Sequence, residues 1–352
     1  MSCKTYRAAL AEAMVSALSE HDHTLIIGQG VADFKGIFGT TTGLKARYPD
    51  RVIDTPIAED SIAGVCIGAA LNGLYPINTH IRADFGLLIF NQLINLAAKY
   101  RYMFGGLFEI PLMMRMVIGR SWGQGAQHSQ SLQSLLAHIP GLVVLMPSCP
   151  TSILSTYEYA IKEHRGPVIM LEHRLMYELE FVGNEPKPST ANPLFGSILA
   201  REGSDVTIVA TSVMVLEAKR AAGYLETYGI SVEIIDLHSI SHPDGQMIIE
   251  SLRKTRRLLV ADTSWQSYGV AAEIARIVCQ YDPALLKRPM MSLGMRSAPC
   301  PTAKVLEDMY YPDVHDIVAS VLTLIDSQTA SHVALPPKES MTDYYKHFKG
   351  PF

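Results

Sequence analysis

The chain alternates between two hydrophobic patterns. Short continuous apolar runs, typical of strands buried on both faces, are followed by segments whose apolar residues recur at helical spacing. In the first half, the predicted strands are 24–30, 51–57, 76–81, 111–119, 143–148 and 167–173, and the predicted helices are 6–18, 61–73, 87–103, 129–139 and 153–164. This alternation predicts a parallel sheet with helices on both faces.

The same alternation returns after a polar interruption. Residues 178–195 are rich in proline, asparagine and charge, a composition typical of a linker. Beyond it the predicted strands are 205–211, 231–237 and 256–263, and the predicted helices are 215–229, 246–255, 270–280 and 314–325. We therefore predict an α/β fold of two three-layer αβα domains with mainly parallel sheets. The predicted units are a domain over 1–180, a linker over 181–196, a domain over 197–328 and a tail over 329–352.

The tail, the composition and the N-terminal segment add four expectations. The tail carries two adjacent prolines and several aromatics, and we interpret it as an arm that is either disordered or laid on a partner. The net charge is −4 without a dense Lys/Arg run, so neither a nucleic-acid nor a membrane partner is predicted. The five cysteines are scattered and never form CxxC, which argues against a disulfide framework or a zinc site. With no apolar signal-peptide core after Met1, a cytoplasmic location is expected.

The segment 54–73 contains the first candidate for chemistry. A predicted strand ends at Thr55 and Pro56, and a helix begins near Asp60, so Glu59 falls in the connection at the carboxyl end of a parallel strand. Ligands bind at that edge in open α/β folds. On local grounds alone, however, an acid at a helix start is more often a cap or a dipole partner, worth under about 1 kcal/mol.

The segment 122–131 contains the second candidate. Gly123 and Gly125 permit unusual backbone angles, and His128 follows them immediately before a predicted helix. A histidine there is suited to general acid–base chemistry, and it is equally suited to bonding the local backbone.

Motifs in a fixed order extend along nearly the whole chain. They are TPI-x-E (55–59), FNQLINLAAKYRYMFGG (90–106), GAQHSQS (125–131), PGL-x-V (140–144), LEHRLMYE (171–178), GVAAEI (269–274) and PCPTAKVLEDMYYP (299–312). This order resembles the β subunit of the thiamine-diphosphate-dependent pyruvate and branched-chain 2-oxo acid dehydrogenases, from about Lys4 to Ile325. The resemblance implies a transketolase-like pyrimidine-binding domain followed by a transketolase C-terminal domain.

The resemblance also implies roles for individual residues. Glu59 is expected to bond N1′ of the cofactor's aminopyrimidine and so promote loss of the thiazolium C2 proton. Phe85 and Ile57 are expected to contact the cofactor, with core packing as the alternative for Phe85. His128 is expected to face the reacting centre and an incoming lipoyl group. Arg115 and His138 also match family positions, and for them a structural role stays open.

The family often has a potassium site built from backbone carbonyls near residues 159–167. Ala160 and Ile161 match that pattern, whereas Glu163 and Arg165 replace the usual Asp and Asn. An arginine beside a cation is unfavourable, so the sequence indicates at most a weak potassium site.

The second half of a thiamine diphosphate site is missing. The Mg²⁺ and diphosphate motif of this family begins with GDG, which occurs nowhere in the chain, and Asp244-Gly245 lacks the flanking strand. We therefore expect a separate α-type subunit to hold Mg²⁺ and the diphosphate, in an α2β2 heterotetramer.

Several residues near the expected site depart from the family pattern. The substrate-side candidates are Arg82, Asp84, Arg120, Trp122 and Gln127, and His80 in the same HIRAD segment is also unusual. They indicate a polar or anionic donor or acceptor, with surface drift as the alternative.

The expected function is decarboxylation of a 2-oxo acid with acyl transfer to lipoamide on a lipoyl acyltransferase. One alternative is a split transketolase-like enzyme that moves a ketol or acyl unit without lipoamide. Another is a non-catalytic structural subunit, against which the retention of Glu59 and His128 speaks. The sequence does not name the substrate.

Overall fold

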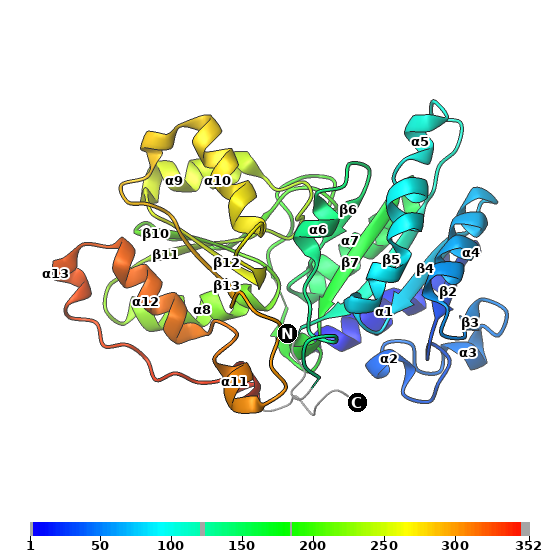
Figure 1. Cartoon of the computed structure of the whole chain (residues 1–352), viewed down its shortest axis with the longest axis horizontal. Helices are drawn as coiled ribbons and strands as arrows, with labels where there is room; N and C mark the ends of the chain where they lie inside the picture. Colours follow the sequence, from blue (N-terminus) through cyan, green and yellow to red (C-terminus); the bar gives the residue numbers. More distant parts are fainter. Residues whose placement is uncertain (1–2, 120–123, 184, 346–352) are drawn as a thin grey trace.

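The computed structural model describes residues 3–119, 124–183 and 185–345. Two α/β units lie side by side, each a sheet between layers of helices (Figure 1). The first contains a six-stranded, all-parallel sheet in the order β3-β2-β4-β5-β7-β6. Its strands are β2 (Thr24–Gly28), β3 (Val52–Asp54), β4 (Tyr75–His80), β5 (Leu112–Ile118), β6 (Val143–Leu145) and β7 (Pro167–His173).

Helices cover both faces of this sheet. They are α1 (Tyr6–Glu20), α2 (Gly36–Gly39), α3 (Leu44–Arg47), α4 (Glu59–Leu71), α5 (Tyr100–Met103), α6 (Gln133–Ala137) and α7 (Pro150–Lys162). Successive residues of β5 enter different cores, Met113 with residues of α1 and α7, and Met114 with residues of α4. The near-continuous apolar strands follow from this burial on both faces.

Two predicted helices differ from the observed ones. Residues 87–103 form parts of a 3-10 helix η1 (Ala83–Ile89), a π-helix η2 (Asn91–Ala97) and α5 instead of one α-helix. The Ala98 amide reaches back five residues to the Leu93 carbonyl, at 2.9 Å. The helix predicted over 129–139 shrinks to α6, because Gln130 and Ser131 instead bond Asp84 and Thr263.

The second unit contains a five-stranded sheet in the order β13-β12-β10-β11-β9, in which only β9 is antiparallel to its neighbour. Its strands are β9 (Ile198–Arg201), β10 (Val206–Ala210), β11 (Val232–Asp236), β12 (Leu258–Trp265) and β13 (Met291–Met295). Its helices are α8 (Val213–Glu226), α9 (Gly245–Thr255), α10 (Val270–Tyr281), η4 (Pro283–Leu285), α11 (Lys304–Asp308) and α12 (Val314–Leu324). The predicted class of two αβα domains is therefore confirmed.

The two units are joined by backbone pairing and by shared core. Met146 donates to the His238 carbonyl at 2.9 Å, and Ile240 donates to the Val144 carbonyl at 2.8 Å. A short ladder also links β1 (Cys3–Thr5) to β8 (Glu180–Val182), which lies after η3 (Arg174–Met176) and extends into the predicted linker. These contacts fix the segment that follows β7 against the start of the chain.

The tail packs on its own chain. After α13 (Ser327–Ala330) it returns along α8 and ends at α14 (Met341–Tyr344), near α11 (Figure 1). Tyr345 is buried and donates to the buried Glu217 of α8 at 2.6 Å. Residues 329–345 therefore pack on their own chain, which contradicts the expectation of a disordered arm, and residues 346–352 lie outside the described part.

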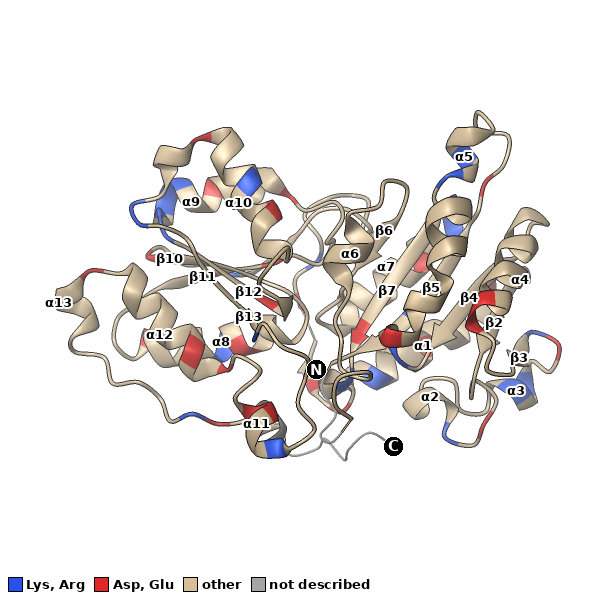
Figure 2. Ribbon diagram, in the orientation of Figure 1, with Lys and Arg blue, Asp and Glu red and all other residues tan. Residues whose placement is uncertain are grey.

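Charged residues are interspersed in sign over both units (Figure 2). Every helix in the described ranges is too short or too polar to traverse a lipid bilayer.

Candidate active site

A cavity of about 940 Å³ opens at the carboxyl ends of β2 and β4. Glu59, Phe85 and His128 all line it, although they come from three different segments of the chain. The edge at which these strands end is where open α/β sheets bind ligands. The three residues that the sequence singled out for cofactor chemistry therefore meet at one place.

Glu59 is the first residue of α4, one position earlier than the predicted helix start. The N-cap position is Ala58, which makes no side-chain cap bond. The Glu59 carboxylate instead accepts a hydrogen bond from Nε2 of Gln29, at 3.3 Å, beside the cavity. The helix terminus still favours a negative charge there. A side-chain capping bond therefore does not hold Glu59 in place.

Phe85 and His128 contact each other edge to face. Their ring centroids are 5.3 Å apart at an interplanar angle of 79°, and Phe85 keeps 38% of its surface exposed. Behind them Gly125 has φ +66°, and a Cβ there would lie 2.6 Å from Oγ1 of Thr302. The positive φ favours glycine here, and the close approach to Thr302 places the His128 loop against the second unit.

Only some of the substrate-side candidates lie at the cavity. Arg82 lines the cavity, and its Nη1 donates to the Gly119 carbonyl at 3.0 Å. Burial lowers the pKa of Arg82 to about 10. Asp84 is buried away from the cavity and accepts from the backbone and side chain of Gln130, at 3.1 and 3.0 Å. Gln127 is exposed and does not line the cavity.

Arg120 and Trp122 lie outside the described residues. Ile57, predicted to contact the cofactor, is 83% exposed and stands outside the cavity lining. The structure therefore groups Arg82 with Glu59, Phe85 and His128, and it does not group Asp84, Gln127 or Ile57 with them.

Sequence reasoning missed part of the lining. Gln29, Asn78 and Gln124 also face the cavity, and Oε1 of Gln124 is a buried acceptor with no hydrogen-bond partner among the described residues. His80 lines it too, and burial lowers the pKa of His80 to about 4, with Glu59 as the opposing influence. Their position in the sequence could have identified them, since most of these residues end or follow a strand of the parallel sheet.

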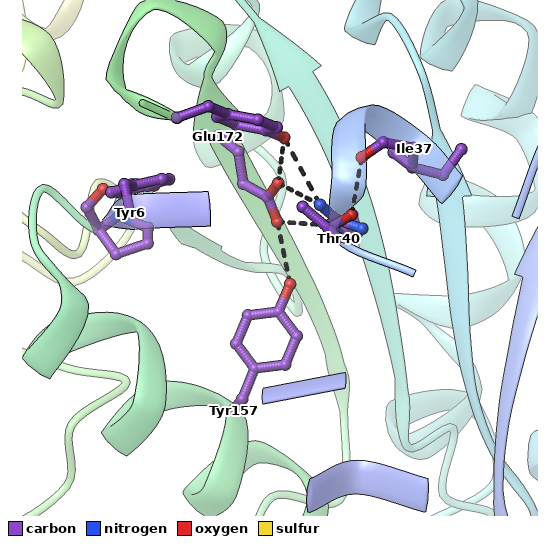
Figure 3. A network of polar contacts seen from close by, with 8 residues as sticks. Tyr6, Ile37, Thr40, Tyr157 and Glu172 are labelled. Carbon is purple, nitrogen blue, oxygen red and sulfur yellow. Dashed lines mark hydrogen bonds and ion pairs between the residues drawn. The ribbon is translucent and has the colours of Figure 1, made fainter. Parts of the chain in front are cut away.

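A separate buried network surrounds Glu172 and Tyr157 (Figure 3), and Arg115 belongs to it. Its guanidinium bonds both carboxylate oxygens of Glu172, at 2.6 and 2.8 Å, and both residues are fully buried. The hydroxyls of Tyr157 and Tyr177 also donate to Glu172, at 3.0 and 2.7 Å. These bonds compensate a buried ion pair and join β5, β7 and α7. His138 is exposed and lines a second cavity of about 780 Å³, between α6 and α10.

The predicted cation position lies at the end of α7. Ala160 and Ile161 point into the core, and Glu163 is the exposed C-cap. Nη2 of Arg165 donates to the Lys162 carbonyl at 3.2 Å, so a positive group already bonds this helix end. Asp244 is an N-cap that accepts from the Met247 amide at 2.9 Å.

The donor set of the main cavity fits one half of thiamine diphosphate. A carboxylate, an exposed aromatic face and an unpartnered amide oxygen suit a neutral aminopyrimidine ring. In the described ranges no cluster of His, Cys, Asp or Glu is able to hold a metal ion. The residues that line the cavity therefore fit the pyrimidine half of the cofactor.

Comparison with known proteins gives a match for each of the two units. Residues 3–180 match the transketolase pyrimidine binding domain, and residues 197–317 match the transketolase C-terminal domain. The chain is 36% identical to the acetoin:2,6-dichlorophenolindophenol oxidoreductase subunit beta of Cupriavidus necator, covering 89% of this chain and 94% of the relative. It is also 36% identical to the pyruvate dehydrogenase E1 component subunit beta of Rickettsia conorii, covering 90% and 97%.

One solved structure shares the fold at a TM-score of 0.73 and 22% identity, covering 90% of this chain and 97% of the other. It is described as a split gene transketolase, inactive beta4 tetramer. With its two matching domains and its relatives at this level of identity, the chain belongs to the transketolase-like family of E1 β subunits of pyruvate and acetoin dehydrogenases.

Proposed function

We propose that this chain is the β subunit of a thiamine-diphosphate-dependent enzyme that decarboxylates a 2-oxo acid and passes the acyl group to lipoamide. Family membership supports the reaction class. The observation that carries the proposal is the single cavity shared by Glu59, Phe85 and His128. A half-buried carboxylate, an aromatic face and an imidazole are the groups that such chemistry requires from this half of the site.

The bound cofactor would supply a carbon nucleophile and an electron sink for decarboxylation. Glu59 would hold a proton at its carboxyl for N1′ of the pyrimidine, and Gln29 would keep that carboxyl oriented. Phe85 would pack on the ring, and Ile57 would contribute only where a partner covers its exposed side chain. His128, in contact with Phe85, would donate or accept a proton on the substrate side.

An α-type partner is part of the proposal. It would bring the Mg²⁺ and diphosphate ligands, in an α2β2 assembly that delivers its product to a lipoyl acyltransferase. Phe34 lines the cavity yet is 85% exposed, and Ile57, two residues before Glu59, is also largely exposed to solvent. Exposed apolar side chains at a cavity mouth favour burial by another chain. We propose no potassium at Ala160, Ile161 and Glu163, because Arg165 bonds the neighbouring helix end.

A second candidate is a split transketolase-like enzyme that transfers a ketol or acyl unit to a small acceptor. The polar lining of the cavity by His80 and Arg82 favours it, because such groups suit donors richer in hydroxyl and anionic groups than simple 2-oxo acids.

Co-expression with the α-type partner tests both candidates. The purified complex, loaded with Mg²⁺ and thiamine diphosphate, would be given a panel of 2-oxo acids and ketoses. Release of carbon dioxide with reduction of an artificial acceptor, together with acylation of lipoamide, is the expected result. Ketol transfer without carbon dioxide release from 2-oxo acids would favour the second candidate. Failure of every donor would contradict both and leave a structural subunit.

A further inference from the structure

Asn78 and His80 form a polar pair at the carboxyl end of β4. Both line the cavity, as expected for alternate residues of one strand. Nδ2 of Asn78 donates to the Ile27 carbonyl of neighbouring β2 at 3.1 Å. Nε2 of His80 lies 2.7 Å from Oδ1 of Asn78.

These two contacts fix the tautomer of His80. A backbone carbonyl only accepts, so the Asn78 atom that faces Ile27 is the amide nitrogen, and Oδ1 faces His80. Oδ1 also only accepts, so Nε2 of His80 carries the hydrogen. A neutral imidazole has a single N–H, and Nδ1 of His80 therefore bears a lone pair. Burial, which lowers the pKa of His80 to about 4, keeps the ring neutral near pH 7.

The lone pair of Nδ1 is available to a ligand. Among the described residues, Nδ1 of His80 has no hydrogen-bond partner, and it is absent from the fully buried atoms that lack one. His238 provides the contrast. Its Nε2 donates to the Pro193 carbonyl, and its Nδ1 is sealed in the core without a partner. His80 presents its acceptor at a cavity, and His238 does not.

A cation lines the same cavity as this acceptor. Arg82 follows His80 by two residues and is only 4% exposed, with its guanidinium donating to the Gly119 carbonyl. Guanidinium groups bind carboxylate and phosphate oxygens strongly. The cavity lining therefore includes an acceptor for a hydroxyl and a cationic group for an anion.

We propose that His80 is a specificity-determining residue whose Nδ1 accepts a hydrogen bond from a hydroxyl group of the donor substrate, while Arg82 binds its anionic group. The inference rests on the proposed function and narrows it to hydroxylated donors, such as 3-hydroxy-2-oxo acids or ketose phosphates. In a cavity filled by substrate, an analogue without the hydroxyl leaves this acceptor unpaired, which is why such sites discriminate strongly.

The test compares 3-hydroxypyruvate with pyruvate, which differ by one hydroxyl, on the α–β complex loaded with cofactor. We expect kcat/KM to favour 3-hydroxypyruvate by at least about tenfold. His80→Phe should lower that ratio by about tenfold or more. His80→Gln should largely preserve it, because the amide keeps a donor for Asn78 and an acceptor at similar spacing. His23→Gln, an exposed histidine at the other end of β2, is the matched control and should change nothing.

Each alternative outcome is distinguishable. A ratio near one in the wild type, or one that His80→Phe leaves unchanged, overturns the proposal. If His80→Phe weakens cofactor binding about tenfold without changing the ratio, the acceptor serves the cofactor's amino group, and the proposal is also overturned. If the wild-type complex turns over neither acid, its affinities for the two acids are measured by calorimetry and compared. A retained preference with no turnover overturns the proposed reaction and supports the role of His80, whereas no preference overturns that role.

Discussion

At the residue scale, the proposed role of Glu59 is the one that a single substitution tests most directly. Glu59→Gln removes the proton-holding carboxyl but keeps the shape and the contact with Gln29. We expect exchange of the cofactor's C2 proton and steady-state turnover to fall by about 10²-fold or more, with assembly unchanged. Exchange followed by NMR, with light scattering for assembly, measures both. Gln29→Ala is the companion variant and should cost far less. Normal C2 exchange in Glu59→Gln would remove the assignment.

His128 is expected to act after the cofactor is activated. Its ring touches Phe85 in the cavity, while its backbone is held by the Gly125 carbonyl at 3.4 Å. His128→Ala should therefore leave cofactor affinity and C2 exchange near wild-type values and slow turnover by about 10²-fold. Pre-steady-state kinetics locate the slow step. Unchanged turnover, or loss of cofactor binding in parallel with turnover, would contradict this division of labour.

The sequence predicted the site residues that belong to a recognisable motif. It missed residues that reach the cavity only because neighbouring strands of the sheet bring them there. Glu59 and His128 were ambiguous locally, and only the order of motifs along the chain favoured chemistry. Gln29 and Asn78 join them because β2 and β4 are neighbours in the order β3-β2-β4, which no local pattern encodes. The substrate-side candidate Gln127 does not line the cavity, whereas Gln124, on the other side of the left-handed Gly125, does.

At the scale of elements, the buried Arg115–Glu172 pair ties β5 to β7. Arg115→Met would leave the Glu172 carboxylate buried without its cation, a change that typically costs on the order of 3–5 kcal/mol. Urea unfolding of the complex measures the cost. Lys162→Met breaks the exposed Lys162–Glu158 pair and is the control, expected to cost far less because solvent screens that pair. Equal costs for the two variants would show that Arg115 has no special structural role.

Strands with a clear apolar pattern were predictable, and some strands without one were not. The central strands β5 and β7 are recognisable as apolar runs, and so are the edge strands β3 and β6 of the same sheet. β8, β9 and β13 were missed, because pairing with distant strands rather than side-chain pattern decides that they form. The tail was misjudged for a related reason, since its fixed points on α8, Glu217 and Arg220, are polar contacts over a hundred residues away.

At the scale of the whole molecule, stability should fall as the solution is acidified. Burial lowers the pKa values of His80, His164 and His238 to about 4, whereas an unfolded histidine titrates near about 6.5. Between these pKa values the unfolded chain thus binds more protons than the folded chain. The contribution of these histidines to the free energy of unfolding is therefore fully present above about pH 6.5 and is lost as the pH falls toward about 4. Asp236 opposes this trend, because burial raises its pKa to about 6, and the cost of its charge disappears on acidification.

His238 isolates one of these contributions, because it is sealed in the core away from the candidate site and has φ +51°. His238→Asn suits that left-handed backbone and removes the titrating ring. One proton fewer taken up on unfolding should flatten the fall in unfolding free energy between pH 6.5 and 4 by up to about 1.4 kcal/mol per pH unit. Denaturant titrations at several pH values give the slopes, with the exposed His23→Asn as control. Identical slopes in His238→Asn and wild type would mean that His238 is already protonated in the native protein, and that its burial does not set the acid sensitivity of the fold.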